Sequence, residues 1–190
     1  EIMRANIKKW SVGSPIQAAL DAVEYLLAHE SFEAGQIERV TVRLPDREAH
    51  IVDGRTMPDV NLQYLVSAFL VRGAMDFRTS HDYAAMSDPA IAQMRARVEL
   101  VPDAELSAAV PRRQGIVEIA LSDGRTLARR TRAVRGTADN PMSEEEVAAK
   151  ARDLVADVLG EAAAQEVAER VLGIEATGDV RALRPVLQPA

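Results

Sequence analysis

The sequence predicts an α+β fold, in which a small, largely antiparallel sheet is packed by helices and a helical segment closes the chain. Apolar Val40, Val42 and Leu44 alternate with polar residues, as in a half-buried strand. Two further alternating runs flank Asp123-Gly124, the dipeptide typical of a tight hairpin. Runs with helical spacing surround these strands, and helices segregated from an antiparallel pair indicate α+β. We expect the 190 residues to form one domain, residues 1–190.

The first third of the chain predicts two amphipathic helices around one strand. Residues 1–14 have no clear period and predict an extended lead-in. Apolar residues recur at helical spacing over 15–30, and the strand at 40–44 ends at a proline. The pattern of residues 46–58 does not distinguish between helix, strand and loop. A second helix follows, with Asp59 expected as its cap and Gly73 as its end.

Short elements are expected in the middle of the chain. Residues 74–87 predict loop and turns, and Asp88-Pro89 predicts the start of a short helix that reaches about Met94. A strand at Val98–Leu100 is stopped by Pro102, and a connector of residues 103–113 leads to the hairpin of 116–121 and 126–132.

Helices are expected at the C-terminal end. Ser143 and Glu146 have the spacing of a capping box, so a helix should begin there and end at Gly160. A second helix should close at Gly173, and Asp179 is a candidate cap for a last short one.

The composition excludes several classes of function. No cysteine is present, which removes disulfides and thiolate chemistry, and the three histidines are too widely spaced for an expected zinc site. A net charge of −6 argues against nucleic acid as the partner. Basic pairs such as Arg112-Arg113 are interpreted mainly as solvated faces. Without a long apolar run or a signal segment, we expect no membrane span and a cytoplasmic protein.

Four stretches, in order and at matching spacing, resemble proteins of the MmgE/PrpD family, to which 2-methylcitrate dehydratase belongs. The residues that match are Ile7-Lys8-Lys9-Trp10 with Pro15 and Asp21-Ala22; Asn61-Leu62-Gln63-Tyr64; Phe77 with Asp88-Pro89 and Val98 to Pro102-Asp103; and Arg135-Gly136, Asp139-Asn140-Pro141, Ser143, Glu146 and Lys150. The stretch from Arg135 to Pro141 is the most recognisable of them. We expect it to be structural and to link the hairpin to the terminal helices.

The resemblance implies the smaller, C-terminal domain of such an enzyme. In the family a larger, all-helical domain precedes this region, and the chain opens on Glu1 rather than methionine, so we expect a piece of a longer protein or a processed one. The family's enzymes dehydrate, decarboxylate or epimerise small di- and tricarboxylates without a metal or organic cofactor. The resemblance therefore implies a polycarboxylate substrate, a cleft shared with the helical domain, a homodimer, and a domain that is inactive alone.

Two site residues carry over directly. Lys8 matches the family's lysine, which would stabilise the negative charge that develops beside a carboxylate. Tyr64 matches its tyrosine, with a role in proton transfer or substrate anchoring. A solvated lysine and a buried structural tyrosine are the alternatives.

The family's histidine does not carry over, because Gly13 lies near its position. The hydroxyls of Ser11 and Ser14 could replace the imidazole, although Ser14 precedes a proline and could simply cap a helix. Gln17 and His81 complete the candidate substrate-binding residues, and an exposed loop histidine is the alternative for His81.

Two other functions stay open. The chain could be a non-catalytic structural or dimerisation domain, which a large exposed apolar patch at residues 10–20 or 59–72 would favour. It could also be an unrelated ligand-binding module, which Lys8 and Tyr64 on opposite sides of the domain would favour. Convergence of Lys8, Tyr64 and the Ser11–Ser14 loop on one concave edge would favour the enzyme.

Overall fold

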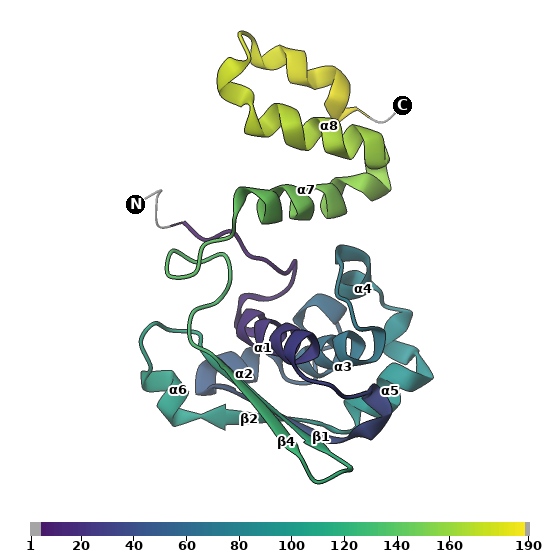
Figure 1. The fold of residues 1–190 in the computed structure, drawn as a ribbon, viewed down its shortest axis with the longest axis vertical. Helices are drawn as coiled ribbons and strands as arrows, with labels where there is room; N and C mark the ends of the chain where they lie inside the picture. Colours follow the sequence, from purple (N-terminus) through teal and green to yellow (C-terminus); the bar gives the residue numbers. More distant parts are fainter. Residues whose placement is uncertain (1–4, 189–190) are drawn as a thin grey trace. The chain divides into compact units, whose positions relative to one another are not determined.

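The computed structural model describes residues 5–188, and the chain divides into two compact units (Figure 1). The first unit ends at Pro141 and the second begins at Met142. The first contains all the strands of the described residues, and the second contains helices only, so the α+β prediction is confirmed.

A four-stranded mixed sheet forms the centre of the first unit. Its strands are β1 (Ile37–Pro45), β2 (Val98–Asp103), β3 (Gly115–Leu121) and β4 (Thr126–Thr131), in the order β2-β1-β3-β4. β1 pairs parallel with β2 and antiparallel with β3, and β3 and β4 form the predicted hairpin. At its turn Gly124 has φ of +87°, a left-handed conformation that favours glycine.

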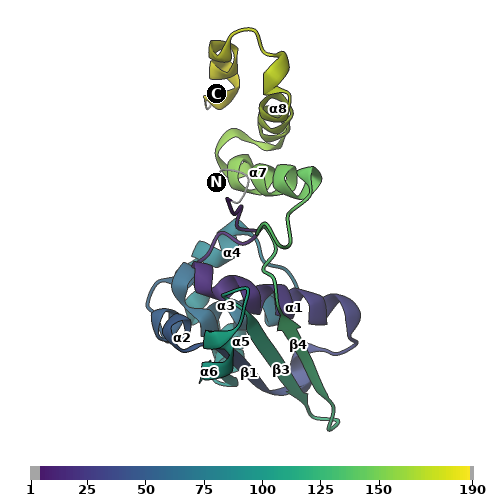
Figure 2. The ribbon, with the colours of Figure 1, turned by 90° about the vertical axis from the view of Figure 1, so that its left-hand side faces the viewer.

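One face of this sheet is covered by helices. The burial of β1 and β3 alternates, with Val40, Val42 and Val117 fully buried and Thr41 only half-buried. The helix α1 (Gln17–His29) packs over β3 and β4, as both views show (Figures 1 and 2). α2 (Asp46–Val52) and α3 (Leu62–Arg72) pack over β2, while α5 (Pro89–Arg95) packs on α3. Each large apolar side chain fully buried in this layer contributes about 1.5–3 kcal/mol.

Three short helices and two caps differ from the sequence prediction. α2, α4 (Phe77–His81) and α6 (Ala104–Ala108) each span seven residues or fewer, too few to show a helical period. Asp59 does not cap α3, because it lies in a 3₁₀ turn and the Asn61 side chain accepts from Tyr64 N at 2.8 Å instead. Ser14 is also no cap: it is the first residue of a 3₁₀ turn that leads into α1, and its side chain makes no capping bond.

The second unit is a pair of helices followed by a 3₁₀ segment. α7 (Glu144–Leu159) begins at the predicted capping box, with both of its reciprocal bonds formed, and α8 (Glu161–Leu172) follows after Gly160. The 3₁₀ segment Val180–Leu187 is capped by Asp179, as predicted. No helix between residues 5 and 188 is both long and apolar enough to cross a membrane.

Candidate functional site

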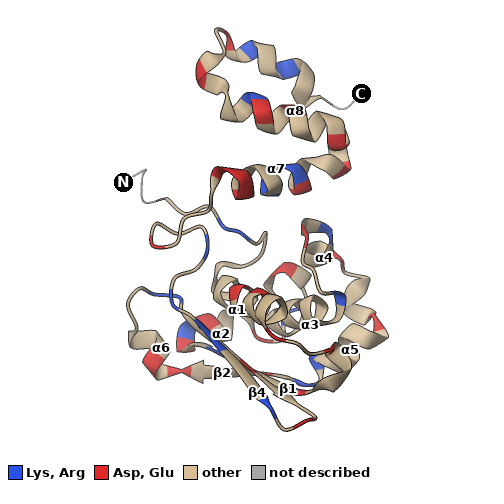
Figure 3. Cartoon of the chain, viewed as in Figure 1, with Lys and Arg blue, Asp and Glu red and all other residues tan. Residues whose placement is uncertain are grey.

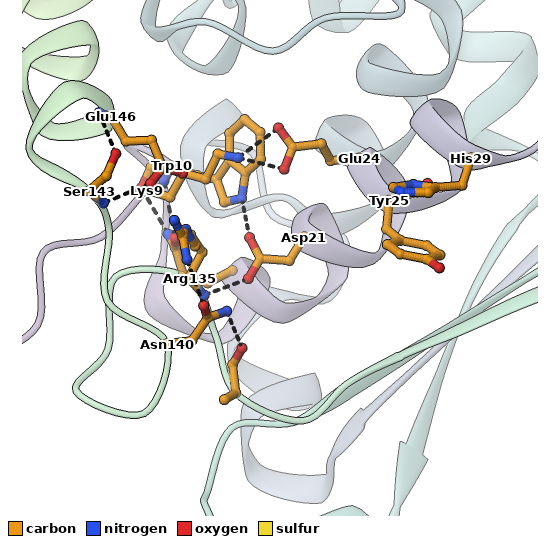
Figure 4. A network of polar contacts seen from close by, with 12 residues as sticks. Lys9, Trp10, Asp21, Glu24, Tyr25, His29, Arg135, Asn140, Ser143 and Glu146 are labelled. Atoms are coloured by element: carbon orange, nitrogen blue, oxygen red, sulfur yellow. Dashed lines mark hydrogen bonds and ion pairs between the residues drawn. The ribbon is translucent and has the colours of Figure 1, made fainter.

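The lead-in and the loop after β4, which is distant in the sequence, meet at the carboxylate of Asp21, which comes from α1 (Figure 4). Its Oδ1 accepts from the indole Nε1 of Trp10 at 2.8 Å, and its Oδ2 accepts from the backbone N of Arg135 at 2.8 Å. Trp10 belongs to the lead-in and Arg135 to the loop after β4. Burial raises the pKa of Asp21, and the two hydrogen bonds oppose that shift. Asp21 therefore ties the lead-in and the loop to the same helix.

The loop from Arg135 to Pro141 is held by its own polar groups. Arg135 donates through NH1 to Asn140 Oδ1 at 2.8 Å, and Asn140 Nδ2 donates to Ala133 O at 3.0 Å. Gly136 has φ of +90°, and its N–H donates to Asn140 O at 2.8 Å. Its carbonyl in turn accepts from Ile7 N at 2.8 Å. These bonds explain why the loop needs an arginine and a glycine at 135 and 136 and an asparagine at 140.

The Gln17 side chain, at the start of α1, holds the backbone of the lead-in at Trp10. This side chain is buried, and its Nε2 donates to Trp10 O at 2.8 Å while its Oε1 accepts from Trp10 N at 3.2 Å. Lys8 belongs to the same lead-in and donates through Nζ to Val12 O at 2.9 Å. Among residues 5–188 no carboxylate pairs with Lys8, so its positive charge is not neutralised by this part of the chain.

The lead-in, the loop before β3 and the loop after β4 line one pocket of about 400 Å³, a size typical of small-molecule sites. Its lining includes Lys8, Arg112, Arg113 and Arg135, and Asp139 is the one acidic lining residue among the described positions. Figure 3 shows Lys and Arg on all three of these segments. The surplus of positive charge suits an anionic ligand, since charged groups in a partly enclosed pocket attract it more strongly than they would in water.

Only some of the predicted site residues meet here. Lys8, Ser14 and Gln17 line the pocket, and Ser11, Tyr64 and His81 are not among its lining residues. Gln17 is committed to holding the lead-in, and Ser11 lies half-buried in a bend of that segment.

Tyr64 and His81 lie elsewhere in the first unit. Tyr64 is fully buried and its hydroxyl donates to Thr79 O at 2.7 Å. Burial raises the pKa of its phenol above the ordinary value. His81 ends α4, with Nδ1 at 3.0 Å from Phe77 O and 2.9 Å from Ser80 Oγ, and its ring stacks on Phe77. Both side chains thus have local partners that hold α4 in place.

The two arginines before β3 were missed by sequence reasoning. An adjacent basic pair in an irregular connector has no period, and nothing local distinguishes it from a solvated charge cluster. Arg135 was recognised within its motif but was expected to be only structural. The described residues also contain no group of three His, Asp or Glu side chains placed to hold a metal ion.

The exposed apolar side chains do not lie on the two surfaces, residues 10–20 and 59–72, that a docking domain would be expected to use. Among residues 5–188, the large apolar side chains that stay exposed lie outside both 10–20 and 59–72. Many of them belong to the second unit: Val158, Val171, Leu172, Ile174, Val180 and Leu187. The large apolar side chains at 10–20 and 59–72 are therefore buried or half-buried.

An α+β unit with a cationic pocket between its lead-in and two loops is a domain suited to binding small anions. Residues 10–174 match the family model of the MmgE/PrpD C-terminal domain, and the chain belongs to this family, whose lyases act on carboxylates. No curated protein matched the chain in a sequence search.

Proposed function

We propose that the chain is the C-terminal domain of a lyase or isomerase that acts on a small di- or tricarboxylate without a cofactor, and that the cationic pocket binds the substrate's carboxylates. The observation that carries this proposal is the gathering of Lys8, Arg112, Arg113 and Arg135 around one pocket, in a chain whose net charge is −6. A cleft lined by cations raises the local concentration of anions, which supports a role in binding an anionic substrate.

The chemistry follows from these charges. Removal of a proton or of CO₂ from the carbon next to a carboxylate leaves an electron pair that spreads onto that carboxylate, as in an enolate. In a dehydration, departure of the hydroxyl group as water then discharges this negative charge. Fixed cations at hydrogen-bond distance stabilise this charge, and they act more strongly in a pocket from which water is partly excluded. Lys8 is best suited to the role, because its ammonium has a single hydrogen bond, to Val12 O, among the described residues. Arg135 lines the same pocket from the loop after β4.

Proton transfer needs a further group. Asp139 is the only carboxyl among the described pocket residues, and no imidazole lines the pocket. We assign Tyr64 to the support of α4, because its hydroxyl is buried on Thr79 O. The proposal therefore places the acid or base on a helical domain that would supply the other wall of the site, with a second copy of the chain as a further partner.

The test is calorimetric titration of citrate, as a tricarboxylate probe, into the chain at low ionic strength. The proposal expects saturable binding at one site, and Lys8→Met should weaken it about tenfold, as expected for loss of a charge-assisted contact. Arg39→Gln is the matched control, since Arg39 is exposed on β1, outside the pocket, and loses the same unit of charge. Absence of binding, or equal weakening by both substitutions, would contradict the proposal.

A further inference from the structure

The segment between α6 and β3, residues 109–114, presents two adjacent arginines to the pocket, and we call it the arm. Arg112 and Arg113 are both exposed and both line the pocket. Among residues 5–188 neither guanidinium has an ion-pair partner, in contrast to Arg43, which pairs with Asp103. Two like charges side by side without an acid repel each other, so the arrangement is most favourable when an anion binds between them.

The backbone of this arm is strained at Arg113. Its φ of +65° lies in the left-handed region, and it is the one non-glycine residue between 5 and 188 with a positive φ. This conformation costs a side-chain-bearing residue about 1–2 kcal/mol. Such residues persist where the surroundings hold them, and they are frequent at ligand-binding sites. The left-handed backbone at Arg113 is therefore consistent with a ligand-binding role for its side chain.

Gln114 provides the surroundings that hold the arm. Its side chain is 3% exposed, its Nε2 donates to Pro111 O at 3.0 Å, and its Oε1 accepts from Arg130 Nε at 3.0 Å. Arg130 lies on β4, so the clamp connects the arm to the sheet. The arm is therefore braced at its base while both arginine side chains are free to meet a ligand.

We propose that Arg112 and Arg113 bind a second carboxylate of the substrate, and that this arm makes the site selective for molecules with two or more carboxylates. The inference rests on the proposed function, in which Lys8 and Arg135 bind the first carboxylate. Guanidinium groups suit this role because their planar donors match the two oxygens of a carboxylate. Gln114 is a positioning residue, which acts through the arm and touches no substrate.

The experiment compares succinate, a dicarboxylate, with butyrate, a monocarboxylate of the same chain length, by NMR titration of the labelled chain at constant ionic strength. The wild type should bind succinate at least about tenfold more tightly, since an arginine–carboxylate contact contributes that much. The double variant Arg112→Gln/Arg113→Gly should lose this preference and bind butyrate as before. Glycine keeps the left-handed backbone, and removal of both cations leaves Lys8 and Arg135 in place.

Two further variants separate position from charge. Gln114→Ala retains both cations and releases the clamp, so it should reduce the succinate preference partially while its thermal unfolding is checked alongside. Arg39→Gln should leave the preference unchanged.

The outcomes distinguish the two proposals. If the wild type binds both ligands equally, or the double variant keeps its preference for succinate, the arm proposal is wrong although a carboxylate pocket remains. If the wild type binds neither ligand, the carboxylate pocket itself is wrong and the arm proposal falls with it.

Discussion

Substitution of Asp21 by asparagine should loosen the connection between the lead-in and the loop after β4. The wild-type carboxylate accepts from Trp10 Nε1 and from Arg135 N, each at 2.8 Å. Asparagine keeps the shape, but it has one carbonyl oxygen and replaces the other with an NH₂ group. That NH₂ would face an N–H donor, so one of the two N–H groups must lose its acceptor. Because both are only partly buried, we expect a loss of about 1–2 kcal/mol in the free energy of unfolding.

The pH dependence of this loss has a definite sign. Burial raises the pKa of Asp21 in the folded protein above its unfolded value near 3.8. A raised folded pKa means that the stability from this group is fully present below the unfolded pKa and declines as the pH rises through the folded value. The asparagine variant has no such titration. The stability difference between wild type and variant should therefore be larger below pH 4 than at pH 7.

Urea unfolding measured by tryptophan fluorescence suits this prediction, because Trp10 is the sole tryptophan of the chain and is itself a donor to Asp21. Glu24→Gln is the matched control: it removes a carboxylate from the same helix, whose partner is Lys9 in a partly exposed pair. Such a pair contributes about 0–1 kcal/mol. Equal effects of the two substitutions, or a difference that does not change with pH, would refute the role given to Asp21.

Three other predictions concern local contacts. Ser143→Ala should remove the capping box of α7 and cost about 1 kcal/mol, measured as lost helix content and an earlier circular-dichroism transition; an unchanged transition would contradict the cap. Tyr64→Phe should lower the free energy of unfolding by about 0.5–1.5 kcal/mol, through the lost bond to Thr79 O, while citrate affinity stays the same; a selective loss of affinity would return Tyr64 to the site. Burial of Asp103 raises its pKa, but hydrogen bonds from Leu106 N and Arg43 outweigh this and hold the pKa below the usual value, so the stability that it contributes should persist above the unfolded pKa and be lost as the pH falls through the folded one. An acid titration of Asp103→Asn beside the wild type checks that sign, because the difference should vanish at low pH.

The elements that the sequence predicted correctly are those fixed by local chemistry. The Asp-Gly turn specifies the β3–β4 hairpin, and the Ser143–Glu146 spacing specifies the start of α7. The choice of Asn61 over Asp59 as the cap of α3 was not predictable in this way, since both residue types cap helices equally well and tertiary packing decides between them. Short helices such as α6 leave too few residues for a period.

In the candidate site too, one residue could be predicted from the sequence and another could not. Lys8 could be proposed from the resemblance, and the structure places it in the pocket lining. The part played by Arg113 depends on a backbone conformation that Gln114 stabilises and on proximity to a lead-in about a hundred positions earlier in the sequence, and neither is encoded in a local pattern.

The stretches that resemble the family gain a physical explanation from the network at Asp21. Trp10 and Asp21 belong to the first of these stretches and Arg135 to the last, and the Asp21 carboxylate accepts hydrogen bonds from both of the others. A cationic pocket gains from such an arrangement, because the like charges of Lys8 and Arg135 repel each other, while the bonds at Asp21 and the bond from Ile7 N to Gly136 O hold their segments together. The partly buried Asp21 holds these segments together and is not itself among the pocket's lining residues. The residue that holds the pocket's segments in place is thus different from the residues that provide its charge. A substitution at Asp21 should alter the affinity for mono- and dicarboxylates alike. A substitution at Arg113 should alter the ratio of the two affinities.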